Sequence, residues 1–225
     1  MTKDKAMITY QDVQNNEEFN AYIQKGNELL GVLGYTDHSA AHTMKVAMTA
    51  GKILEKLGYD QRTVELAKIT GYIHDIGNMV NRIDHAQTGA LLAFNILTRM
   101  GMPPDELAAV VGAIGNHDES TGLPVSGMSA AIIIADKTDV RRSRVRNRDF
   151  ATFDIHDRVN YAVEESVLTI RPEERMIQLD LTIDHEICSV LDYFEIFLGR
   201  MILCKRSAEY LQVGFKIMAN GAKLL

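Results

Sequence analysis

The stretch Tyr72-Ile73-His74-Asp75-Ile76-Gly77 places an imidazole beside a carboxylate at the end of an apolar segment. Glycine is common just after the last turn of a helix, so we expect a helix to end here with both polar side chains accessible. The pair alone is a weak signal, because His156-Asp157 repeats it in the same chain. Its weight comes from further residues that could join it around a metal ion, namely His38, His42, His85, His117 and Asp136.

Apolar residues recur at helical spacing through most of the first 163 residues. The spacing predicts helices over 17–33, 37–57, 61–75, 85–100 and 153–163, and two more that begin at Pro104 and near Ser129. We expect Asp60 and Ser129 to cap helices, and Asp84 with Gln87 to form a capping box. His42 and Asp136 fall on apolar helix faces, where an unpaired polar group would cost free energy.

The pattern changes near residue 165. Residues 167–170 and 176–183 alternate as strands do around a turn at 171–174, which predicts a hairpin. A helix over about 186–211 follows, and then a strand over 215–219 before the turn signal Asn220-Gly221. The sequence therefore predicts a mainly α protein, with a helical bundle domain at 1–165 and a small mixed α/β element at 166–225.

The net charge of −6 argues against a protein that mainly coats nucleic acid, since that task requires positive charge. Residues 1–20 lack the basic start and apolar run of a signal peptide, so we expect a cytoplasmic protein. The run 187–204 is apolar, but Asp192, Glu195 and Arg200 interrupt it. A buried helix is therefore expected here, not a membrane span, and the same helix could serve as the face of a homodimer.

Histidine and aspartate together offer the nitrogen and oxygen ligands that suit Fe, Mn, Co, Ni or Zn. A single histidine near a helix core is more often structural than a ligand, but here several converge. We expect one divalent ion to be held by His42, His74, Asp75 and Asp136. A second could be held by His85 and His117, with Asp75 between the two ions. Two such ions lower the pKa of a shared water towards about 7 and hold a phosphoryl oxygen, which is a route to phosphoester hydrolysis.

With this set of residues the chain resembles the HD-domain metal-dependent phosphohydrolase superfamily, whose His-Asp-Ile-Gly signature it carries at 74–77. The resemblance covers about residues 36–142. The superfamily's ordered pattern of histidines and aspartates is matched by His42, His74-Asp75, His85, His117 and Asp136. The resemblance implies an all-helical bundle that holds one or two divalent ions, with Asp75 in the catalytic centre and hydrolysis by attack of a metal-bound hydroxide.

Similarities to particular subfamilies bear on the substrate. The spacing of His38 and His42 resembles that of cyclic-nucleotide phosphodiesterases, which implies that His38 donates a proton to the leaving oxygen. A stretch around residues 116–124 resembles the cyclic-di-nucleotide phosphodiesterases, but the chain departs from them at Asn78, Asn116 and Leu123. These departures argue against a cyclic dinucleotide.

A third similarity, closer in length, is to the bacterial HD-type symmetrical diadenosine tetraphosphate hydrolases. They too carry an alanine-aspartate pair followed by arginine, as in Ala135-Asp136 and Arg141-Arg142 here. If the helix continues past Asp136, Arg144 lies about 12 Å beyond it on nearly the same face. Arg141 and Arg144 are therefore candidates to bind substrate phosphates, although a solvated basic helix end would give the same pattern.

We therefore expect a hydrolase for a small phosphorylated molecule of nucleotide type, with a phosphoester or phosphoanhydride bond to break. We expect neither a nucleic acid nor a membrane as its partner. The alternative is a regulatory module that binds a nucleotide in the same pocket without turnover, an option that Asn78 and Asn116 leave open. His156 and His185 have polar surroundings, and we expect both at the surface.

Overall fold

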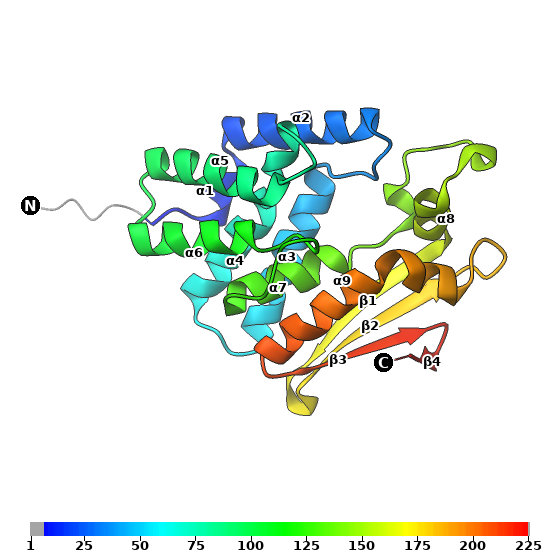
Figure 1. Cartoon of the computed structure of the whole chain (residues 1–225). Coiled ribbons are helices and arrows are strands. Elements are labelled where there is room, and N and C mark those ends of the chain that lie inside the picture. Colours follow the sequence, from blue (N-terminus) through cyan, green and yellow to red (C-terminus); the bar gives the residue numbers. More distant parts are fainter. Residues whose placement is uncertain (1–6, 225) are drawn as a thin grey trace, which may run out of the picture.

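A computed structural model describes residues 7–224, so the outermost residues of the two predicted domains, 1–6 and 225, lie outside the described part. The predicted mainly α class is confirmed. Figure 1 shows a helical bundle at one end of the molecule and a small sheet at the other. The bundle consists of α1 (Tyr10–Gln14), α2 (Glu17–Val32), α3 (Ala40–Lys56), α4 (Gln61–Ile73), α5 (His85–Met100), α6 (Pro104–Gly115) and α7 (Gly127–Lys137).

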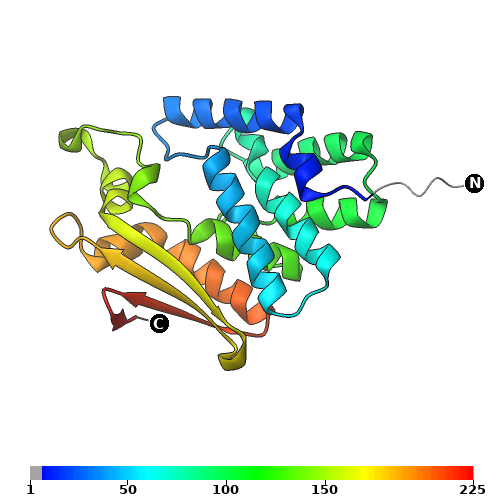
Figure 2. The same cartoon turned by 180° about the vertical axis from the view of Figure 1, so that it is seen from behind.

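Helix α3 lies in the middle of the bundle, where it packs against α4 and α7 (Figure 2). Val46, Ala50 and Ile53 recur at helical spacing on its buried face. Helix α4 approaches closely because Gly71 faces Ala47, and a Cβ at Gly71 would lie 2.8 Å from the Ala47 Cα. The small residues thus let the backbones of α3 and α4 touch, which brings their polar ends together.

The start of α3 differs from the prediction. The helix begins at Ala40 and not at residue 37, because the Ser39 hydroxyl caps it by accepting the amide N–H of Ala41. Asp37 in turn accepts the Ser39 hydroxyl at 2.6 Å. His38 therefore precedes the helix and does not share a helical face with His42, as the spacing had suggested.

Other helix ends confirm or correct the predicted caps. Asp60 caps α4 as expected. Asp84 instead has a left-handed φ of 57° and makes no side-chain cap, so the predicted capping box at α5 is wrong. Gln87 donates to the Gly115 carbonyl oxygen of α6 instead. At α7 the cap is Ser126, three residues before the predicted Ser129.

The C-terminal region forms a four-stranded sheet in the order β1-β2-β3-β4. The predicted hairpin is confirmed by β1 (Val163–Arg171) and β2 (Met176–Ile183), which pair antiparallel around the short 3₁₀ helix η4 (Pro172–Glu174). The predicted terminal strand is β3 (Gly214–Ala219), which runs parallel to β2. The Asn220-Gly221 turn leads into β4 (Ala222–Lys223).

The long helix α9 (Val190–Tyr210) provides the crossover between β2 and β3. It starts later than predicted, where Ser189 and Asp192 form a capping box. The helix lies along the sheet on the side of α7 and packs against both, with Tyr193 and Phe197 buried (Figure 1). Over residues 7–224, no helix combines the length and apolar character needed to cross a membrane.

The segment between bundle and sheet contains two 3₁₀ turns, η2 (Arg142–Arg144) and η3 (Phe150–Thr152), and the predicted short helix α8 (Ile155–Ala162). Because α9 packs on α7, the bundle and the C-terminal element share a packed interface. The division into two domains at residue 165 stays a prediction.

The sharpest packing constraint lies beside the His-Asp pair. The 3₁₀ helix η1 (Ile76–Met79) follows α4 directly, and Gly77 within it lies against the first turns of α5. A Cβ at Gly77 would overlap the His85 carbonyl oxygen and lie 2.6 Å from the Gly89 amide nitrogen. Only glycine fits here without moving one backbone segment away from the other.

Replacing Gly77 with alanine should therefore lower the free energy of unfolding by about 3 kcal/mol, because the overlapping atoms belong to the backbone and cannot rotate away. Gly112→Ala in α6 is the matched control, since a Cβ there meets no atom within 4 Å. That control should be neutral or stabilise the fold by up to about 1 kcal/mol. Denaturant unfolding measures both variants, and equal stabilities would contradict the close approach of η1 and α5.

Candidate metal centre

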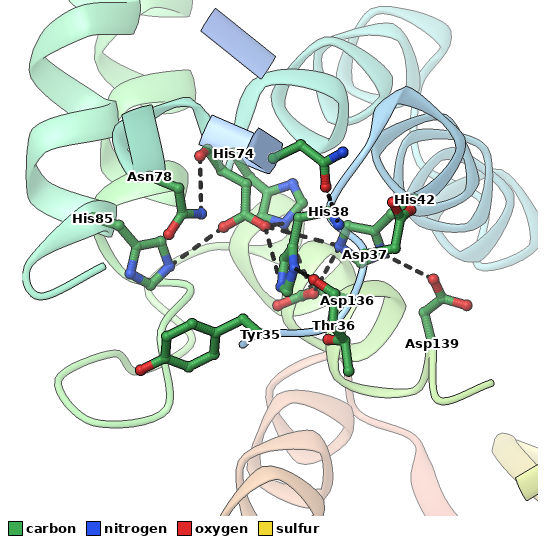
Figure 3. Close-up of polar contacts among 12 residues, drawn as sticks. Tyr35, Thr36, Asp37, His38, His42, His74, Asn78, His85, Asp136 and Asp139 are labelled. Carbon is green, nitrogen blue, oxygen red and sulfur yellow. Dashed lines mark hydrogen bonds and ion pairs between the residues drawn. The ribbon is translucent and has the colours of Figure 1, made fainter. Parts of the chain in front are cut away.

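Asp75 lies at the centre of a cluster of imidazoles, at the junction of α4 and η1. Its Oδ2 faces His74 and His42, at 3.4 and 3.9 Å from their Nε2 atoms. Its Oδ1 faces the other way, at 3.4 Å from His85 Nε2 and 3.6 Å from His117 Nε2. Figure 3 shows the labelled side chains of His85 and His42 on opposite sides of the cluster, with His74 between them. One buried carboxylate thus faces two separate pairs of histidines.

Asp136 in α7 lies beside His42 and His74, the histidines that face Asp75 Oδ2. Its Oδ1 lies 3.3 Å from His42 Nε2 and 3.7 Å from His74 Nε2. In the described part of the chain, two sets of three side chains bring nitrogen or oxygen atoms within 4.8 Å of one another. These sets are His42, His74 and Asp136, and His74, Asp75 and His117. His85 extends the second set, with its Nε2 only 3.1 Å from that of His117.

The ring orientation of each histidine is fixed from behind by a hydrogen bond at Nδ1. The acceptors are the carboxylate of Asp139 for His42 and the carbonyl oxygens of Gly71, Arg82 and Ile114 for His74, His85 and His117. With Nδ1 donating these bonds, the Nε2 atom of each ring faces the cluster. Metal-binding histidines are held in this way in proteins.

The Nε2 atoms of two of these histidines indicate whether the cluster suits a metal ion. The Nε2 atoms of His42 and His74 are buried and have no hydrogen-bond partner among the described residues. A buried polar atom without a partner costs free energy, and native structures contain few of them. A divalent cation would satisfy both nitrogens and both nearby carboxylates, so the donor set fits a transition metal.

The lowered pKa values of the two carboxylates in the cluster also fit a metal site. Burial alone would raise the pKa of Asp75, but His74 and His117 outweigh it and hold that pKa well below its usual range. The pKa of Asp136 is also held well below its usual range, because Lys137 and His42 outweigh its burial. Both carboxylates are therefore ionised at neutral pH, as metal ligands must be.

The pKa values of His74 and His85 shift in opposite directions. Burial lowers the pKa of His74, but the carboxylates of Asp75 and Asp136 raise it to about 10. His85 lies farther from Asp136, and its burial together with His117 lowers its pKa to about 4. The imidazole of His85 is therefore neutral at physiological pH, as a histidine that binds a metal must be.

His38 reaches the cluster from the loop before α3. Its Nε2 is 4.0 Å from Asp75 Oδ2, and its Nδ1 donates to the Thr36 carbonyl oxygen at 2.7 Å. Burial and the nearby Arg144 hold the pKa of His38 well below normal, so the ring is neutral. A role as proton donor requires a second proton on Nε2, and it stays a prediction.

A cavity of about 320 Å³ opens onto this cluster. Asp75, His38, His85 and Asp136 form part of its wall. Four cationic side chains also line it, namely Arg82, Lys137, Arg144 and Arg200. The facing wall comes from the start of α8 and includes Asp154, His156, Asp157 and Asn160. His156 is exposed as expected but borders the cavity, whereas His185 lies elsewhere on the surface, against Asn220.

The predicted phosphate-binding arginines occupy different positions from those expected. Helix α7 ends at Lys137, so it does not continue to Arg144. Arg144 returns to the cavity through η2, where it is 7% exposed and donates to the carbonyl oxygens of Asp37 and Asp139. Arg141 is not among the described residues that line the cavity. Its guanidinium forms two hydrogen bonds with the Asp139 carboxylate, at 2.7 and 3.0 Å.

Three residues of the centre were not among those expected from the sequence. Asp139 is buried and orients His42 through a 2.8 Å hydrogen bond. Arg82 and Lys137 line the cavity, and Lys137 Nζ lies 2.8 Å from Asp136 Oδ2. Asp139 could have been singled out, because an aspartate next to the apolar Val140 and close to Asp136 needs a partner when buried.

Comparisons with known proteins identify the family of this chain. A sequence model of the HD domain matches residues 40–159. An uncharacterised protein of Methanocaldococcus jannaschii is 29% identical over 203 residues, which cover 80% of this chain and 77% of that protein. Ribonuclease Y of the Aster yellows witches'-broom phytoplasma is 26% identical over 121 residues, which cover 54% of this chain but 21% of that protein.

The crystal structure of a predicted HD superfamily hydrolase from an uncultured Thermotogales bacterium is also similar, with a TM-score of 0.44 and 24% identity. The similarity covers 55% of this chain and 67% of that one. The HD-domain match spans more than half of the chain and includes every residue of the cluster from His42 to Asp136. The chain therefore belongs to the HD-domain family of metal-dependent phosphohydrolases.

Proposed function

We propose that this protein is a phosphohydrolase with two divalent transition metal ions, and that Asp75 bridges them. The observation that carries the proposal is the pair of Asp75 oxygens, each facing its own pair of histidines. His42, His74 and Asp136 would hold one ion, and His85 and His117 the other. When bound, such ions lower the pKa of a coordinated water and polarise a phosphoryl group.

The cavity supports a small phosphorylated substrate. Its volume of about 320 Å³ lies at the lower end of the range for small-molecule sites. Arg82, Lys137 and Arg144 place positive charge on the walls beside Asp75 and Asp136, where they would bind and orient phosphate oxygens.

A nucleotide is the class of substrate that we favour. One relative, ribonuclease Y, bears the name of an enzyme that acts on RNA, whose bonds are nucleotide phosphoesters. The net charge of −6 suits a small nucleotide better than an extended nucleic acid. His156, Asp157 and Asn160 also line the cavity and offer hydrogen-bonding groups for the sugar or base.

Asp75→Ala should abolish phosphate release and reduce the bound metal, because both ions lose their shared ligand. Metal analysis of anaerobically purified protein, with phosphate release from a panel of mono-, di- and dinucleotides, measures both effects. Asp105→Ala, on the exposed start of α6, is the control and should behave as the wild type. Hydrolysis that persists in Asp75→Ala would locate the activity elsewhere, and nucleotide binding without turnover in the wild type would favour the regulatory module.

Asp139→Asn should weaken metal binding by about 10- to 100-fold, because His42 loses the carboxylate that orients its ring and increases its basicity. The change keeps the shape of the side chain, and titration of apoprotein with metal gives the affinity directly. Asp105→Asn serves as the exposed control. An unchanged affinity would mean that His42 is not a ligand or is oriented by other contacts.

His38→Ala should keep its full metal content and lose activity by about 10²- to 10⁴-fold, the range for a lost general acid. We expect activity to fall without loss of metal because His38 lies on the cavity wall, outside the two sets of candidate ligands. Metal analysis and kcat measured on the same preparation test it. Loss of metal together with activity would instead make His38 a ligand.

A further inference from the structure

A series of ion pairs leads from the metal centre to the C-terminal element. Lys137 Nζ lies 2.8 Å from Asp136 Oδ2 and 2.6 Å from Glu119 Oε2. The other oxygen of Glu119 accepts a 2.9 Å hydrogen bond from Arg200 Nε. Acidic and basic side chains therefore alternate along this series of contacts.

Arg200 is the last residue of this series of ion pairs and also lines the cavity. It comes from α9, yet it lines the same cavity as Asp75 and Asp136. Its guanidinium lies over the ring of Phe197, at 4.8 Å from the centroid, and the side chain is 31% exposed. Only Nε makes a hydrogen bond to another residue of the described part. The two terminal nitrogens are therefore free to bind a ligand in the cavity.

Building on the proposed function, we propose that Arg200 forms a subsite for a second, non-reacting phosphate group, so that the substrate carries at least two phosphates in a row. A guanidinium fixed at Nε and stacked on an aromatic ring presents its two remaining nitrogens as a fork, the geometry that binds phosphate through two oxygens. The C-terminal element would then contribute to substrate binding as well as to the fold.

The position of Arg200 assigns it to the second phosphate and not to the reacting one. Lys137 contacts Asp136 directly, whereas Arg200 reaches that carboxylate only through Glu119 and Lys137. None of its hydrogen bonds or ion pairs in the described part involves a histidine of the metal centre. The reacting phosphate belongs near Asp75, and a phosphate bound at Arg200 would lie farther along the wall, beyond Lys137 and Glu119.

The test is the binding of inorganic pyrophosphate to protein kept metal-free with a chelator, measured by calorimetry. Arg200→Gln should weaken this binding by about 10- to 100-fold, the range for loss of a charge-assisted hydrogen-bonded pair. Arg206→Gln is the matched control, because Arg206 is exposed on the same helix. Equal affinities of the two variants would overturn the subsite and leave Arg200 as a link between α9 and the bundle.

Arg200→Lys keeps the proposal testable if the glutamine variant fails to fold, because lysine preserves the ion pair with Glu119 but lacks the fork. It should also bind pyrophosphate several-fold more weakly than the wild type, and wild-type affinity would contradict the inference. With metal bound, Arg200→Gln should raise KM for a nucleoside diphosphate and leave KM for the monophosphate unchanged. Because pyrophosphate binding is measured on chelated protein, it does not depend on hydrolysis. Binding through Arg200, together with no turnover by the metal-loaded protein, would refute the proposed function alone.

Discussion

A negative charge that is almost removed from water governs this structure. Asp75 is 7% exposed, and a carboxylate in such a position requires nearby positive charge or hydrogen-bond donors. Without an ion, the protein supplies this charge as a proton on His74, whose pKa is raised to about 10. The inward nitrogens of His42 and His74 remain without hydrogen bonds among the described residues. A divalent cation satisfies all of these groups at once, whereas any single proton satisfies only some of them.

The backbone of the bundle explains how the residues are brought so close together. Gly71 lets α4 touch α3, and Gly77 lets η1 touch α5, so each helix end delivers its side chain to the same point. The second contact places Asp75 and His85 on neighbouring backbone segments with no room for a larger residue between them. Carbonyl oxygens in the last turns of helices then orient two of the rings, as Gly71 does for His74 and Ile114 for His117. The fold and the site thus depend on the same close contacts.

Much of this could be predicted from the sequence. The helical spacing predicted the bundle, and the period-two pattern after residue 165 predicted the hairpin and the terminal strand. The six expected metal ligands converge because each lies on a buried helix face or at the end of a helix, where periodicity is informative.

The remaining features depend on tertiary contacts that spacing does not encode. Arg144 reaches the cavity only because α7 stops at Lys137 and the chain folds back through η2. Arg200 stands out in the sequence only as a charge within an apolar run, and its place beside Glu119 depends on how α9 docks on α7. Helix α3 starts later than predicted because Ser39 caps it, and Ser126 caps α7 in place of the predicted Ser129.

The most direct test of a bridging Asp75 is anomalous diffraction from crystals of the protein loaded with manganese or nickel, recorded at the absorption edge of the metal. We predict two anomalous peaks, one on each side of the Asp75 carboxylate, the first beside His42, His74 and Asp136 and the second beside His85 and His117. A single peak away from Asp75, or none in fully loaded crystals, would contradict the two-metal centre.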